Sequence, residues 1–310
     1  MMGGYKETLM TLHRNLTCLL ALALTAATAQ ANPVVYTIGD SGQFGTVDLS
    51  TGSFSPIGPG IPVGTGGLVQ GPAGNLLSLG FDGTLYSINP NTGTLSTVGA
   101  TGLGNCATPA SACGSNAANI IGSVGSNLYA TDFANHLYSV NPVTGIATLI
   151  GSTGIPSLPF TPHSSVPGDP DGSFYIFDET LFSHDGVLYA NFDAGIFDPV
   201  TFTPTSLVDP LLYQINTTTG LASVLSAVDF GLAGLTDVNG TVYGFSLPTA
   251  SVVTLDLATG SATYVSDADP AAGMVGGATA VAPTPELSSL TLAGTGLTML
   301  AACLRRKLGA

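Results

Sequence analysis

The sequence predicts an all-β fold made of repeated antiparallel units, and three observations carry this prediction. One fifteen-residue pattern recurs along the chain, in its clearest form over residues 137–151. Each copy is preceded by another strand-like segment that ends in a dipeptide similar to Leu137-Tyr138, such as Leu128-Tyr129. The copies also follow one another at intervals typical of propeller blades, about 40–50 residues. We therefore expect a β-propeller of about five four-stranded blades.

The reference copy is typical of a strand that runs into a tight turn. Leu137 and Ser139 alternate with Tyr138 and Val140, as residues do on the two faces of a pleated strand. In the Asn-Pro-Val-Thr-Gly word that follows, the Asn can bond its own backbone, the Pro presets a turn dihedral and the Gly accepts positive φ. A return strand occupies residues 146–150. In the five copies, the turn ends in Gly52, Gly93, Gly145, Gly220 and Gly260. These glycines are separated by 41, 52, 75 and 40 residues.

The first repeat lacks the Gly-rich apolar strand that opens the other four. A segment of the right character lies at the other end of the domain, over residues 273–281. We expect it to pair with the strand that holds Val34–Ile38 and to close the ring, because closure removes free sheet edges.

The interval between Gly145 and Gly220 is longer than the others and holds two inserts. One covers residues 152–171, and the other, predicted as a loop, covers residues 193–210. Loops of this size on a repeat scaffold are common binding sites. Alternatively, residues 155–210 form a degenerate extra blade, so that six or seven blades remain alternatives to five.

The chain is expected to have three parts: a signal peptide over residues 1–31, a propeller domain over 32–282 and a C-terminal segment over 283–310. Lys6 and Arg14 precede an apolar run at 16–27, and Ala29 and Ala31 form an A-x-A cleavage site. These features predict export.

All basic residues lie in the terminal segments, so residues 32–304 contain eighteen acids and no Lys or Arg. Such a domain repels phosphate backbones, which excludes nucleic acids as partners. The acids fit either a soluble extracellular surface or the binding of divalent cations.

The sequence Asp169-Pro170-Asp171-Gly172 is the best candidate for a cation site. Two carboxylates around a tight Gly turn resemble half of a calcium loop. No Glu follows at the spacing of a helix-loop-helix calcium site, and the alternative is an acidic turn. Cys106 and Cys113 lie in a loop of small residues. Because the chain is expected to be exported, we expect a disulfide between them.

Catalytic motifs are missing from the sequence. There is no His-Glu-x-x-His, and a phosphate loop is impossible in a domain without Lys. His136, His163 and His184 show no Ser-His-Asp order. Three carboxylates lie near predicted strand ends: Asp132, Asp178 and Asp237. They either line the channel of the propeller or cap turns. We expect a non-enzymatic domain without a cofactor, Ca²⁺ at Asp169 and Asp171 being the alternative.

Residues 283–310 resemble the PEP-CTERM sorting signal of exported bacterial proteins. Pro285 and Glu286 match the first two letters of its word, Leu287 stands where a second Pro is usual, and a terminal basic cluster follows: Arg305, Arg306 and Lys307. The eighteen residues from 287 to 304 are just long enough for a transmembrane helix, with the basic cluster on the cytoplasmic side. The resemblance implies an exosortase-type protease as partner and a transient membrane anchor; a plain tail anchor is the alternative.

The repeats also resemble the L-Y-x-I-N-P-x-T-G blades of uncharacterised extracellular propellers. The chain contains no Trp, so the aromatic motifs of quinone-binding blades are missing. We expect a propeller at the bacterial cell surface or outside the cell that binds extracellular polysaccharide or a surface protein through its loops. The alternative function is a secreted hydrolase or lyase that uses a divalent cation in the channel.

Overall fold

The fold was taken from a computed structural model. It describes residues 32–39, 42–62, 64–104, 117–155, 174–197, 204–229, 231–246, 249–273 and 275–280. All of them except Asn32 belong to one compact unit, Pro33–Val281. The predicted signal peptide and C-terminal segment lie outside them. Within the described segments, no helix combines the length and apolar character needed to cross a membrane.

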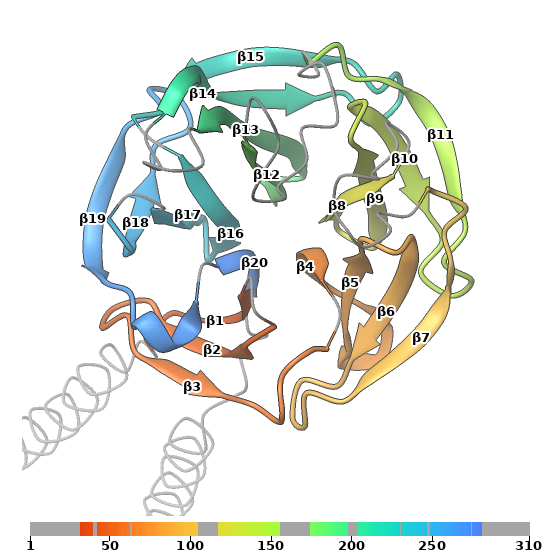
Figure 1. The fold of residues 1–310 in the computed structure, drawn as a ribbon, viewed down its shortest axis with the longest axis horizontal. Helices are drawn as coiled ribbons and strands as arrows, with labels where there is room; N and C mark the ends of the chain where they lie inside the picture. The colour runs from red at the N-terminus through yellow and green to blue at the C-terminus, as the bar shows by residue number, and fades with distance from the viewer. Residues whose placement is uncertain are drawn as a thin grey trace, which may run out of the picture. The chain divides into compact units, whose positions relative to one another are not determined.

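The described strands form five antiparallel four-stranded sheets, which confirms the predicted five-bladed propeller. The sheets surround a common axis, with one strand of each next to it (Figure 1). From the axis outward, blade 1 consists of β20 (Val275–Ala280), β1 (Val34–Gly39), β2 (Phe44–Asp48) and β3 (Phe54–Pro56), and blade 2 consists of β4 (Thr65–Gln70), β5 (Leu76–Gly80), β6 (Thr84–Ile88) and β7 (Leu95–Ala100). Blade 3 consists of β8 (Ala118–Val124), β9 (Asn127–Asp132), β10 (His136–Val140) and β11 (Ala147–Ser152), and blade 4 consists of β12 (Phe174–His184), β13 (Val187–Phe197), β14 (Pro204–Ile215) and β15 (Ala222–Ala227). Blade 5 consists of β16 (Leu232–Val238), β17 (Thr241–Ser246), β18 (Ser251–Leu255) and β19 (Ala262–Asp267).

The ring closes through β20, as the sequence predicts. This last strand pairs antiparallel with β1, with Val35 opposite Ala280 and Thr37 opposite Ala278. The first blade therefore combines the beginning and the end of the domain, and β20 covers the inner edge of β1.

The repeated turn word acts as predicted. Asn141 Oδ1 accepts hydrogen bonds from the backbone N–H of Val143 (2.8 Å) and Thr144 (3.0 Å). Gly145 has φ +80°, and a Cβ placed there would lie 2.7 Å from the carbonyl oxygen of Gly99 in blade 2. The glycine is therefore required both by its own dihedral and by the neighbouring blade.

The hydrophobic core is distributed between the blades. Each of five buried clusters draws its side chains from two adjacent blades; for example, Leu137 of blade 3 packs in one cluster with Leu188 and Ile215 of blade 4. Blades are thus stabilised by their neighbours, and burial of apolar area favours the closed ring.

Blade 4 departs from the prediction. Its first three strands have 11, 11 and 12 residues, whereas the strands of the other blades have 3–7. Part of the insert predicted as a loop over 193–210 is therefore strand, since β13 runs to Phe197 and β14 begins at Pro204. The long interval lengthens an existing blade, and the described residues contain no sixth sheet.

Candidate functional site

The propeller has two different faces, which follow from its connectivity. The innermost strands β4, β8, β12, β16 and β20 run side by side around the axis and end at one face. Because Val35 pairs with Ala280, the chain also enters β1 at that face, which we call the terminus face. The connections between blades, and those between the second and third strands of a blade, lie at the opposite face. We call it the insert face, since residues 105–116, 156–173 and 198–203 are attached there.

The innermost strands approach one another closely because they are rich in glycine. A Cβ at Gly66 of β4 would lie 1.9 Å from the carbonyl oxygen of Asn119 in β8. A Cβ at Gly277 of β20 would lie 2.7 Å from the backbone of Gly67. A ring of five blades brings its inner strands close together, which explains the Gly-rich strands seen in the sequence.

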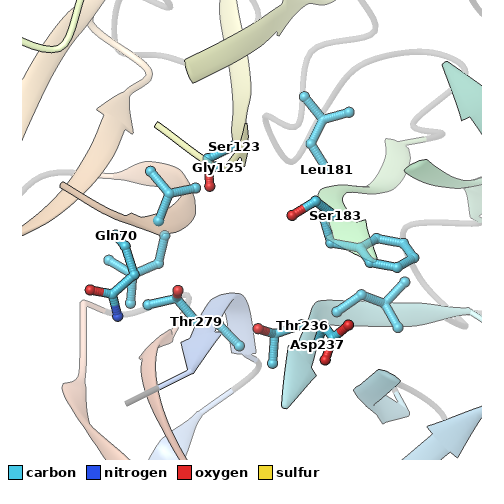
Figure 2. A pocket seen from close by; sticks show the side chains of 13 residues that line it. Gln70, Ser123, Gly125, Leu181, Ser183, Thr236, Asp237 and Thr279 are labelled. Atoms are coloured by element: carbon cyan, nitrogen blue, oxygen red, sulfur yellow. The ribbon is translucent and has the colours of Figure 1, made fainter. Parts of the chain in front are cut away.

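At the terminus face, the innermost strands surround a cavity of about 220 Å³, which we call the channel cavity. The second halves of all five innermost strands contribute to its wall, and Figure 2 shows side chains from several blades around the opening. Polar lining residues are Gln70, Ser123, Ser183, Thr236, Asp237 and Thr279. Among the described lining residues, Asp237 is the only acid or base.

Asp237 is held by a histidine from the neighbouring blade. Its Oδ2 lies 2.6 Å from His184 Nδ1, and its Oδ1 accepts a hydrogen bond from the backbone N–H of Gly240 (2.7 Å). His184 Nε2 lies 3.5 Å from Asp185. The imidazole also lines a second cavity of about 420 Å³, beside Thr241, in blade 5. The pair joins blades 4 and 5, and together with the N–H of Gly240 it gives both oxygens of the carboxylate a partner.

Sequence reasoning missed this pair. His184 and Asp237 are 53 residues apart and belong to different repeats, so no local motif joins them. The signal that could have found them is their shared position, since each stands at the end of an innermost strand.

Asp132 caps a turn and does not line the cavity, so of its two predicted roles the turn cap is the one that holds. Its side chain is fully buried in the turn between β9 and β10. Oδ1 accepts from the backbone N–H of Ala134 (3.0 Å) and His136 (2.9 Å), and Oδ2 accepts from Tyr138 Oη (2.9 Å) and lies 2.9 Å from His136 Nδ1. Burial, and then the hydrogen bond and charge of Asp132, raise the pKa of Tyr138 to about 12.

Other predicted site residues lie outside the described positions. These are Asp169 and Asp171 of the cation site, Cys106 and Cys113, and the sorting and cleavage residues Ala29, Ala31, Pro285, Glu286, Arg305, Arg306 and Lys307. Asp178 is placed on β12, but its side chain is outside the description. The described part of the chain holds no group of three or more His, Cys, Asp or Glu side chains that could bind a metal ion.

No protein-family model and no curated protein matches this sequence. Solved structures do match. A chain of a nidogen/laminin complex is 12% identical with a TM-score of 0.46, and the match covers 81% of this chain and 98% of that one. A Bacteroides thetaiotaomicron protein of unknown function is 16% identical, with a TM-score of 0.44 and coverage of 74% and 54%. The Myxococcus xanthus glutaminyl cyclase is 16% identical, with a TM-score of 0.35 and coverage of 84% and 78%.

Proposed function

We propose that this chain is an exported, non-enzymatic propeller, held at the bacterial cell surface by its C-terminal segment, which binds matrix glycan or protein through its insert face. The observation that carries the proposal is the separation of the two faces. Both ends of the domain lie at the terminus face, while the three inserts are attached at the other. A domain anchored by its end would therefore present its inserts away from the anchor.

The channel cavity favours a binding protein over an enzyme. A hydrolase or lyase that works through a cation needs several carboxylates or histidines at one place. In the described wall of the cavity, hydroxyl and amide groups surround one carboxylate, and both oxygens of that carboxylate already have partners. This arrangement supports the non-enzymatic proposal.

The sorting part of the proposal is tested by following the C-terminal segment. The full chain would be expressed in a bacterial host with and without an exosortase-type protease, and the exported product would be weighed by mass spectrometry. We expect the product to lack residues 1–31 in both hosts and to lose its C-terminal segment only when the protease is present. A Glu286→Ala variant is the matched control and should keep the segment.

An exported product of the same mass in both hosts would contradict sorting by the protease and leave a plain tail anchor. A chain retained in the cytoplasm with residues 1–31 intact would contradict export. Binding is tested separately, by sedimentation of the purified domain with isolated matrix polysaccharide. Loss of sedimentation after replacement of residues 198–203 by a short Gly-Ser linker is the expected result.

A further inference from the structure

The terminus face differs from the insert face in charge. Residues 33–281 contain seventeen acids: nine belong to connections or strand ends of the insert face, four lie within the long strands β12, β13 and β14, and four lie at the terminus face. The four at the terminus face are Asp48, Asp185, Asp237 and Asp256. No Lys or Arg occurs in this stretch, so the connections of the insert face hold more uncompensated acids than those of the terminus face, nine against four. An anionic membrane surface would repel the insert face more strongly than the other.

The terminus face also exposes apolar side chains at its turns. Val143 and Ile146 flank the turn between β10 and β11 and are 75% and 58% exposed. Leu221, in the equivalent turn of blade 4, is 60% exposed. These exposed apolar side chains at turns of the terminus face could contact an apolar or interfacial surface.

The length of chain beyond the propeller limits how far this face can lie from an anchor. Only residues 281–286 separate Ala280 from Leu287, where the apolar C-terminal run begins. Six extended residues reach at most about 20 Å. If residues 287–304 enter a bilayer, the terminus face must stay within that distance of it.

From these three observations we infer that the terminus face lies against the lipid bilayer, with the turns of blades 3 and 4 at the interface and the acidic insert face directed away from it. The inference rests on the proposed anchoring by the C-terminal segment. It has a consequence for ligands, because the channel cavity then opens toward the membrane. Soluble partners would reach the insert face and the rim.

The absence of Trp from the chain makes this inference directly testable. Single Trp residues would be introduced at exposed positions of the terminus face (Val143→Trp and, separately, Asn91→Trp), at the outer rim (Tyr264→Trp) and at the insert face (Ala271→Trp). Each chain, with its C-terminal segment, is reconstituted into phosphatidylcholine–phosphatidylglycerol vesicles that carry a nitroxide-labelled headgroup. Trp quenching is then measured, and circular dichroism shows that each variant is folded.

We expect quenching at Val143 and Asn91 to exceed quenching at Ala271 by about twofold or more, with Tyr264 between them, because the short tether keeps one face near the lipid. Equal quenching at all positions, or the strongest quenching at Ala271, would overturn the inference. Flotation of the same vesicles separates the two proposals. A full chain that does not float refutes the anchor itself, whereas a chain that floats with uniform quenching refutes only the orientation.

Discussion

The propeller domain contains no Lys or Arg, so its carboxylates cannot form salt bridges with them. Some of these carboxylates accept hydrogen bonds within turns and stabilise them. Asp132 shows how a buried carboxylate is satisfied instead. It accepts two backbone hydrogen bonds and a tyrosine hydroxyl, and it contacts one imidazole. Asp82 repeats part of the arrangement in blade 2, with the backbone N–H of Thr84 at 2.9 Å and Tyr86 Oη at 2.6 Å. The Asp–Tyr pair thus recurs at the same position in blades 2 and 3.

Tyr138 should make the stability of the domain depend on pH in the alkaline range. Its pKa is about 12 in the folded protein and near 10 in an unfolded chain, so the folded state holds the proton more tightly. The stabilisation is complete below pH 10 and is lost as the pH rises through 12. Tyr138→Phe should flatten the fall in unfolding free energy over this window, as measured by urea unfolding at several pH values.

An unchanged pH profile in Tyr138→Phe would contradict this role. Tyr264→Phe is the matched control, since Tyr264 is exposed on β19 and bonds only the surface carboxylate of Asp267. Its pKa is also raised, first by the hydrogen bond to Asp267, but solvent screening should make its effect on stability smaller.

At the scale of elements, the Asn-x-x-Thr-Gly turn between the third and fourth strands of a blade also contacts the preceding blade. The first residue after such a turn can bond the preceding blade, as the backbone N–H of Ala147 does with the carbonyl of Thr101 (2.9 Å). Ala222 N–H bonds the carbonyl of Thr153 in the same way. The recurrence of the word therefore reports the assembly of the ring as well as the local turn.

Two glycines separate the local requirement from the contact between blades. Gly145 and Gly154 both have positive φ, +80° and +72°, but a Cβ at Gly154 would meet no atom within 4 Å. Gly154→Ala should cost about 1 kcal/mol, the dihedral strain alone. Gly145→Ala should cost about 2–4 kcal/mol, because it also forces blade 3 away from blade 2. Urea unfolding of both variants gives the difference, and equal costs would refute the contact.

These elements also show what the sequence can and cannot predict. The turns, the five blades and the closing strand were predictable because each depends on local chemistry or on a repeat that lacked one strand. The extension of blade 4 was not predictable, since its strands continue through residues that look like loop in the sequence. Nor was the His184–Asp237 pair, which depends on how two blades pack.

For the whole molecule, the distribution of charge is the dominant feature. A formal net charge of −14, with the basic residues confined to the terminal segments, leaves the propeller domain strongly repulsive toward itself. The packing between blades must outweigh that repulsion. Salt screens charges that are separated by more than about 10 Å at 0.1 M ionic strength.

The domain should therefore become more stable as salt is added. Raising NaCl from about 0.05 to 0.5 M should increase the Tm of residues 32–281 by several degrees, because repulsion between carboxylates is screened. Circular dichroism on heating measures this shift. A Tm that stays constant or falls would mean that charge repulsion is already balanced in the fold.

Closure of the ring by β20 places both ends of the domain on one face, and the proposed orientation depends on it. The direct test is a cysteine pair across that seam, Tyr36→Cys with Thr279→Cys, at positions that lie opposite each other. In a background with Cys106→Ser and Cys113→Ser, mild oxidation should crosslink nearly all molecules, as seen by mass spectrometry of peptides from an Asp-specific protease. A pair left reduced in the folded domain, or crosslinked only between molecules, would contradict the closed ring.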